Sequence, residues 1–98
     1  MSEELLRVAK EVTAKEKPEE ALAIILKEYI QSRIDECEQK TKNFGSKYGV
    51  DIREFYEKLG TDFSLSWECE KDYIDWDWTI AELEELRRTL EKLKTYEN

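Results

Sequence analysis

The side chains of this sequence best suited to chemistry are carboxylates. Glu68, Asp72 and Asp75 are spaced so that a helix including all three would place them on one face. Such a cluster could bind a divalent cation through oxygen, and a pair of these acids could act in glycoside hydrolysis. The same carboxylates also suit the positive end of a helix while staying solvated. Because the spacing lacks the glycine that an EF-hand places after its third acid, we favour the solvated helix end and expect no bound metal.

Other catalytic and cofactor-binding patterns are absent from the sequence. There is no histidine, which is the commonest general base, and neither glycine-rich phosphate-binding pattern occurs. Ser64 and Ser66 have no evident base to activate them, and Cys37 and Cys69 do not form a paired zinc motif. A water-excluding pocket is also hard to build on 98 residues. We therefore expect a non-enzymatic protein without a cofactor, whose two cysteines are separate thiols.

The block of residues 61–86 carries the charge of the whole chain. It holds nine carboxylates against the single cation Lys71, a balance equal to the formal net charge of −8. All three tryptophans lie in the same block. Indoles beside carboxylates suit a surface that offers apolar contacts to a basic protein, whereas the negative field repels phosphate. We therefore predict a basic protein partner and no direct nucleic-acid binding by the isolated chain. The candidate partner-binding residues are Trp67, Asp72, Asp75, Trp76, Asp77 and Trp78.

Two of these tryptophans cannot share one environment. Trp76 and Trp78 are two residues apart, so a helix would direct them to different faces. Trp76 continues a stripe with Ile80 and Leu83, which favours a core position, although it remains among the candidate contacts. Trp78 falls off that stripe and is the better candidate for an apolar contact with a partner.

The first half of the chain predicts two helices. Apolar residues at helical spacing indicate a short helix over residues 2–14, and Pro18 suits the first position of a second helix that runs to about Phe44. This second helix is too long for the rest of so small a chain to cover its apolar face completely. We therefore expect a homodimer through a heptad-like seam, composed of Ile30, Ile34, Cys37 and Phe44.

The second half predicts a turn, a short helix, an extended segment and a long final helix. Gly45 and Gly49 bracket the end of the second helix and leave residues 46–48 as a turn. Asp51 is a candidate N-cap of a short helix that stops at Gly60. Alternation of apolar and polar residues near 62–67 predicts an extended segment, and the last helix is expected to begin near Glu70.

Two stretches carry a resemblance to a known group. Residues 44–50 read Phe-Gly-Ser-Lys-Tyr-Gly-Val and run on to Phe55 and Leu59, while residues 67–76 read Trp-Glu-Cys-Glu-Lys-Asp-Tyr-Ile-Asp-Trp. These stretches resemble the F-x-x-K-Y-G and W-E-x-x-x-D-Y-x-x-W signatures of small prokaryotic antitoxin-like proteins, partners of TumE-type toxins. The likeness covers residues 30–95, and Trp78 departs from the group's pattern. It implies binding without catalytic residues.

Together these observations predict a mainly α, single helical domain over residues 1–98, with a short extended segment near 62–67, that forms a homodimer. No stretch approaches the length of apolar sequence that a membrane span needs, and the first four residues are acidic where a signal peptide is basic, so we expect a cytoplasmic protein. The predicted function is antitoxin-like: the acidic, aromatic surface neutralises a basic toxin. The alternative is a structural homo-oligomerisation module.

Overall fold

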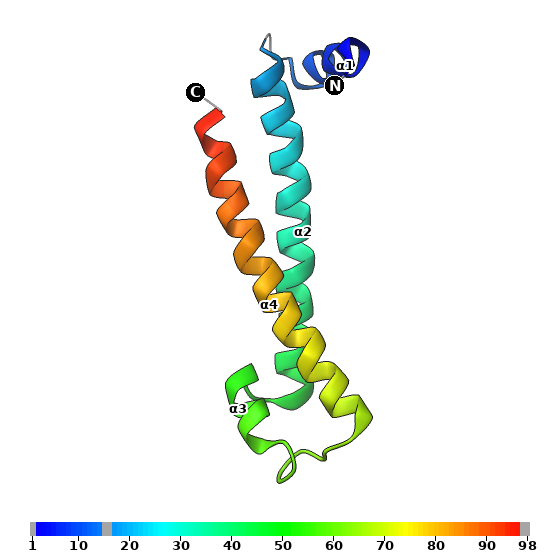
Figure 1. The fold of residues 1–98 in the computed structure, drawn as a ribbon, viewed down its shortest axis with the longest axis vertical. Coiled ribbons are helices and arrows are strands. Elements are labelled where there is room, and N and C mark those ends of the chain that lie inside the picture. The colour runs from blue at the N-terminus through cyan, green and yellow to red at the C-terminus, as the bar shows by residue number, and fades with distance from the viewer. Residues whose placement is uncertain (1, 15–16, 97–98) are drawn as a thin grey trace. The chain divides into compact units, whose positions relative to one another are not determined.

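The computed structural model describes residues 2–14 and 17–96, and helices dominate it (Figure 1). The helices are α1 (Glu3–Thr13), α2 (Pro18–Tyr48), α3 (Ile52–Lys58) and α4 (Trp67–Leu93), and α4 leads into a short 3₁₀ helix, η1 (Lys94–Tyr96). Among the described residues the β-type pairing is confined to an isolated bridge between Leu59 and Phe63. The predicted mainly α fold is confirmed.

The chain divides into two compact units. Unit 1 comprises Met1–Ile34 and Leu86–Asn98, and unit 2 comprises Asp35–Glu85. Unit 2 therefore contains the end of α2, all of α3 and the first two thirds of α4. It also holds all six candidate partner-binding residues that the sequence predicts.

Local capping signals set the starts of α1 and α3. The hydroxyl of Ser2 accepts a hydrogen bond from the backbone N–H of Leu5 at 3.2 Å, and α1 ends where Ala14 adopts a left-handed conformation with φ of 56°. The carboxylate of Asp51 accepts from the N–H of Glu54 at 2.8 Å, which confirms Asp51 as an N-cap. Both caps satisfy N–H groups that a helix start leaves without partners.

The predicted turn over residues 46–48 is wrong, because α2 continues to Tyr48. Gly45 lies inside the helix, and of these two glycines Gly49 alone adopts positive φ, at 70°, as a residue just beyond a helix end often does. The extra helical turn is stabilised by tertiary contacts. Lys47 and Tyr48 both bind side chains of α4, and these contacts outweigh the weak helix preference of glycine.

The predicted start of the last helix near Glu70 is also wrong. Helix α4 begins at Trp67, because the hydroxyl of Ser66 accepts from the N–H of Cys69 at 3.2 Å. Trp67 is therefore helical. The residues between Phe63 and α4 belong to neither a helix nor a strand.

The core of unit 2 is a cluster of aromatic rings around Phe55, which is fully buried. The rings of Tyr48, Phe63 and Trp76 lie 4.1, 5.1 and 5.8 Å from the Phe55 ring, measured between centroids. Trp76 is only 4% exposed, so the predicted core position of this tryptophan is confirmed. Offset and tilted ring pairs of this kind contribute beyond the area that they bury.

The heptad-like seam predicted for a dimer lies within the folded chain. Ile30 and Ile34 are buried in unit 1, and Cys37 is buried in unit 2. Phe44 is half-buried and stacks on Trp76 with ring centroids 5.6 Å apart. The chain therefore covers this seam by itself, and a dimer would need a different surface.

Candidate partner-binding groove

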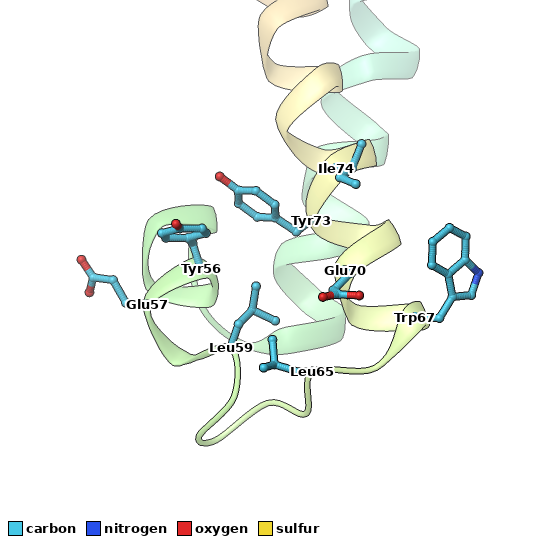
Figure 2. Close-up of a pocket in the computed structure, with 8 residues that line it drawn as sticks. All are labelled: Tyr56, Glu57, Leu59, Leu65, Trp67, Glu70, Tyr73 and Ile74. Carbon is cyan, nitrogen blue, oxygen red and sulfur yellow. The ribbon is translucent and has the colours of Figure 1, made fainter.

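A pocket of about 580 Å³ opens on unit 2 beside α3 and the first turns of α4 (Figure 2). We call it the α3–α4 groove. Its lining is mainly aromatic and aliphatic, with two carboxylates, and consists of Tyr56, Glu57, Leu59, Leu65, Trp67, Glu70, Tyr73 and Ile74.

Helix α3 forms one wall because it turns Phe55 inward and the next residue outward. Tyr56 is exposed, and its ring lies 5.1 Å from that of Tyr73 on α4. The chain then reverses at Gly60, whose φ is 88°, and returns Leu65 toward the same space. A Cβ at Gly60 would lie 3.3 Å from a methyl carbon of Leu65, so glycine permits this close return.

The other wall continues along an apolar stripe on α4. Trp67, Ile74 and Trp78 are spaced by seven and four residues and therefore share the helix face opposite Trp76. Their side chains are 76%, 52% and 74% exposed. Trp67 and Ile74 line the groove, and Trp78 lies one turn further along. Large apolar side chains aligned in this way typically mark an interaction site.

Carboxylates border the groove and the stripe. Glu57 and Glu70 line the groove itself, and Asp77 is exposed beside Trp78. Unit 2 contains fifteen Asp and Glu residues against six Lys and Arg, a formal charge of −9. The remainder of the chain contains ten Lys and Arg against nine Asp and Glu, or +1. The groove thus lies in the strongly negative unit.

A polar cluster ties the end of α2 to the start of α4. Lys47 donates from its ammonium to Asp72 at 2.6 Å and to Glu68 at 3.0 Å, and the Tyr48 hydroxyl donates to the same oxygen of Asp72. Burial and the bond to Asp72 raise the pKa of Tyr48, and the bonds to the two carboxylates raise the pKa of Lys47. Burial alone would raise the pKa of Asp72, but the bonds from Lys47 and Tyr48 outweigh it and hold that pKa below its usual value.

This cluster corrects the role predicted for Asp72. Its carboxylate is 15% exposed and is occupied by Lys47 and Tyr48, so it positions α4 rather than offering a free charge to a partner. The position of Trp76 in the core likewise removes it from the contact surface. Of the predicted contact residues, Trp67, Asp77 and Trp78 are exposed and Asp75 is half-buried.

Several lining residues were missed by the sequence reasoning. Tyr56, Leu59 and Leu65 come from segments whose proximity to α4 depends on tertiary packing. Ile74 could have been found, because it lies seven residues after Trp67 and four before Trp78. That spacing carries meaning only if the helix already includes Trp67, which the prediction excluded.

The described residues contain no group of three or more His, Cys, Asp or Glu side chains placed to hold a metal ion. Likewise, none of the helices in the described part of the chain has the length and apolar character needed to cross a membrane.

Comparison with known proteins gives a family for this chain. Residues 1–98 match the family described as uncharacterized protein MJ0235. The chain belongs to that family. Neither a curated protein nor a solved structure matches it.

Proposed function

We propose that this member of the MJ0235 family is a non-catalytic protein-binding module whose α3–α4 groove receives an apolar segment of a basic protein. The observation that carries the proposal is the exposed stripe of Trp67, Ile74 and Trp78 on one face of α4. Fully burying an apolar side chain of this size contributes about 1.5–3 kcal/mol, so covering the stripe offers substantial binding free energy. The folded chain leaves these three side chains exposed, so the free energy of burying them is available for binding a partner.

The dimensions of the stripe favour a helix as the bound segment. Trp67 and Trp78 are eleven residues apart, which corresponds to about 16 Å along α4. A helix of about three turns with apolar residues at i, i+4 and i+7 would match this length. Glu57, Glu70 and Asp77 border the site and favour Lys or Arg beside those apolar residues.

Toxin neutralisation is the specific form of this function that we propose. A toxin that acts on nucleic acid presents a basic surface, and a unit with a charge of −9 is suited to cover such a surface. The two stretches that resemble antitoxin-like proteins also contact one another, because Lys47 and Tyr48 of the first bind Asp72 of the second. We infer that these signature residues maintain the fold that presents the groove.

A pair of designed peptides tests the binding function. Both form amphipathic helices with leucine at i, i+4 and i+7; one carries lysine on its flanks and the other carries glutamate. Calorimetry should show that the lysine peptide binds and the glutamate peptide does not. Raising salt should weaken binding, because the Debye length is about 10 Å at 0.1 M.

Variants locate the bound peptide. Trp78→Ala should weaken binding of the lysine peptide roughly tenfold or more, as loss of a large aromatic contact at an interface often does. Tyr29→Ala is the matched control, since Tyr29 is an exposed aromatic residue of unit 1. Equal affinity for the two peptides, or equal losses in the two variants, would refute the proposal.

Toxin neutralisation has its own test. A small basic protein encoded beside this chain should arrest growth when expressed alone, and co-expression of this chain should restore growth. Restoration by a Trp67→Ala, Trp78→Ala double variant as complete as that by the wild type would argue against the groove as the neutralising surface. The structural homo-oligomerisation module would then be the better interpretation.

A further inference from the structure

One end of the α3–α4 groove combines two aromatic rings with a carboxylate. The rings are those of Tyr56 and Tyr73, whose centroids lie 5.1 Å apart, and we call them the tyrosine pair. The carboxylate belongs to Glu70, which lines the same groove. Figure 2 shows Glu70 between the tyrosine pair and Trp67. Neither the tyrosine pair nor Glu70 belongs to the exposed stripe on which the proposed function rests.

The geometry of α4 places Glu70 between the stripe and the tyrosine pair. Successive residues of an α-helix turn by about 100°, so Glu70 lies about 60° around the helix from Trp67, and Tyr73 lies about 60° further in the same direction. A segment that covers the stripe therefore has Glu70 along its edge and Tyr73 beyond it. A long side chain of that segment could extend past Glu70 to the rings.

The groove is lined by carboxylates without a cation. Among the described residues, its lining includes Glu57 and Glu70 but neither Lys nor Arg. Glu57 forms an exposed ion pair with Arg53 at 3.4 Å, whereas the Glu70 carboxylate has no hydrogen bond or ion pair within the part of the chain that the structure describes. By contrast Asp72, two residues further along α4, is bound by Lys47. The charge of Glu70 is therefore available to a cation from outside the chain.

A guanidinium group matches the chemistry of this end of the groove. It stacks on aromatic faces, donates two parallel N–H bonds to one carboxylate and is more weakly hydrated than an ammonium. The methylene stem of an arginine suits Leu59 and Leu65, the aliphatic residues of the same lining. A lysine ammonium supplies the charge without planar stacking or paired donors. A quaternary ammonium suits the rings but donates no hydrogen bond to the carboxylate.

We propose that Glu70 and the tyrosine pair form a subsite for an arginine side chain of the basic partner. The guanidinium lies against the rings and donates to the Glu70 carboxylate, while the apolar residues of the partner cover the stripe. This inference rests on the proposed function, because the arginine extends from the segment bound there. It gives the groove a preference for arginine over lysine, which net charge alone would not produce.

Three peptides of equal charge test the subsite with the full chain. Each is the amphipathic helix with leucine at i, i+4 and i+7, and its flanks carry arginine, lysine or trimethyllysine. Calorimetry should show that the arginine peptide binds roughly tenfold more tightly than the lysine peptide, because only a guanidinium both stacks and forms paired hydrogen bonds. The trimethyllysine peptide should bind no more tightly than the lysine peptide.

Glu70→Gln identifies the residue responsible for the preference. Glutamine keeps the size and the helix preference of glutamate but removes the charge, so circular dichroism should show an unchanged helical content. The preference for arginine should fall to about threefold or less in this variant. Glu84→Gln is the matched control, because it removes the same charge from an exposed position fourteen residues further along α4 and should leave the preference unchanged. Tyr56→Leu should reduce the preference, since it removes the more exposed ring of the pair.

Three results would overturn the arginine subsite while leaving the groove as a site for a basic helix. The first is equal affinity of the wild type for the arginine and lysine peptides. The second is tighter binding of the trimethyllysine peptide than of the arginine peptide, which would make the tyrosine pair a site for a quaternary ammonium. The third is a preference for arginine that Glu70→Gln leaves intact or that Glu84→Gln reduces equally. Failure of all three peptides to bind would refute the subsite and the proposed function together.

Discussion

Replacing Trp76 with alanine should destabilise the fold far more than the same replacement at Trp78, although the two lie two residues apart in α4. The Trp76 side chain is 4% exposed and packs on the rings of Phe44 and Phe55 at 5.6 and 5.8 Å. The Trp78 side chain is 74% exposed. The two variants remove the same atoms from one helix, so their difference isolates the effect of burial.

The expected magnitudes follow from that difference. Phe or Trp replaced by alanine in a core typically costs about 3–5 kcal/mol, through lost transfer free energy and the cavity left behind. At Trp76 this would be a large part of a total stability of about 5–15 kcal/mol. An exposed substitution usually stays within about 0.5 kcal/mol, which is the change expected for Trp78→Ala.

Urea unfolding followed by far-ultraviolet circular dichroism measures both changes. Tryptophan fluorescence is unsuitable because each variant loses an indole. Trp76→Ala should lower the midpoint with little change in the slope m, and its thermal midpoint should fall by about 12 °C or more. A loss below about 1 kcal/mol at Trp76, or a loss at Trp78 equal to that at Trp76, would refute the assignment of buried and exposed faces.

Two further predictions concern pH and the end of α2. The pKa of Asp72 is lowered in the fold, so the contribution of Asp72 to stability should be present above about pH 4 and be lost as pH falls further. The pKa of Tyr48 is raised in the fold, so the contribution of Tyr48 to stability should decline above about pH 10. Urea unfolding against pH should show a smaller acid loss in Asp72→Asn than in wild type. Gly45→Ala should stabilise the chain by about 0.5–1 kcal/mol, because Gly45 is helical and a Cβ there would make only a van der Waals contact with the Val50 carbonyl oxygen at 4.0 Å. Gly49→Ala should cost about 1 kcal/mol because the φ of Gly49 is 70°. Thermal midpoints that shift in the same direction in both glycine variants would contradict this account.

The sequence identified the features that depend on near neighbours. Asp51 was a candidate N-cap, and its carboxylate accepts a hydrogen bond from the N–H of Glu54, only three residues along the chain. Pro18 begins α2 as predicted, because its ring already holds the backbone angle of a first helical residue. The periodicity of Trp76 with Leu83 indicated a core face, and both are buried. The exposed position of Trp78 follows from the same periodicity.

The ends of α2 and α4 depended on contacts that the sequence does not display. Glycine at position 45 costs a helix about 1 kcal/mol, and this cost alone favoured an early end. The contacts of Lys47 and Tyr48 with Asp72 join residues 25 and 24 positions apart. They extend α2 by four residues beyond the predicted end at Phe44.

The sequence alone therefore determined the helical class, the faces of α4 and the concentration of negative charge in the second half of the chain. Only the tertiary structure decided which acidic and aromatic residues are available to a partner. Asp72 is bound by α2, Trp76 lies in the core, and Tyr56 and Leu65 join Trp67 and Ile74 around one groove. The physical reason is that composition and periodicity report on a residue and its neighbours within a helix, whereas availability depends on which distant side chains pack against it.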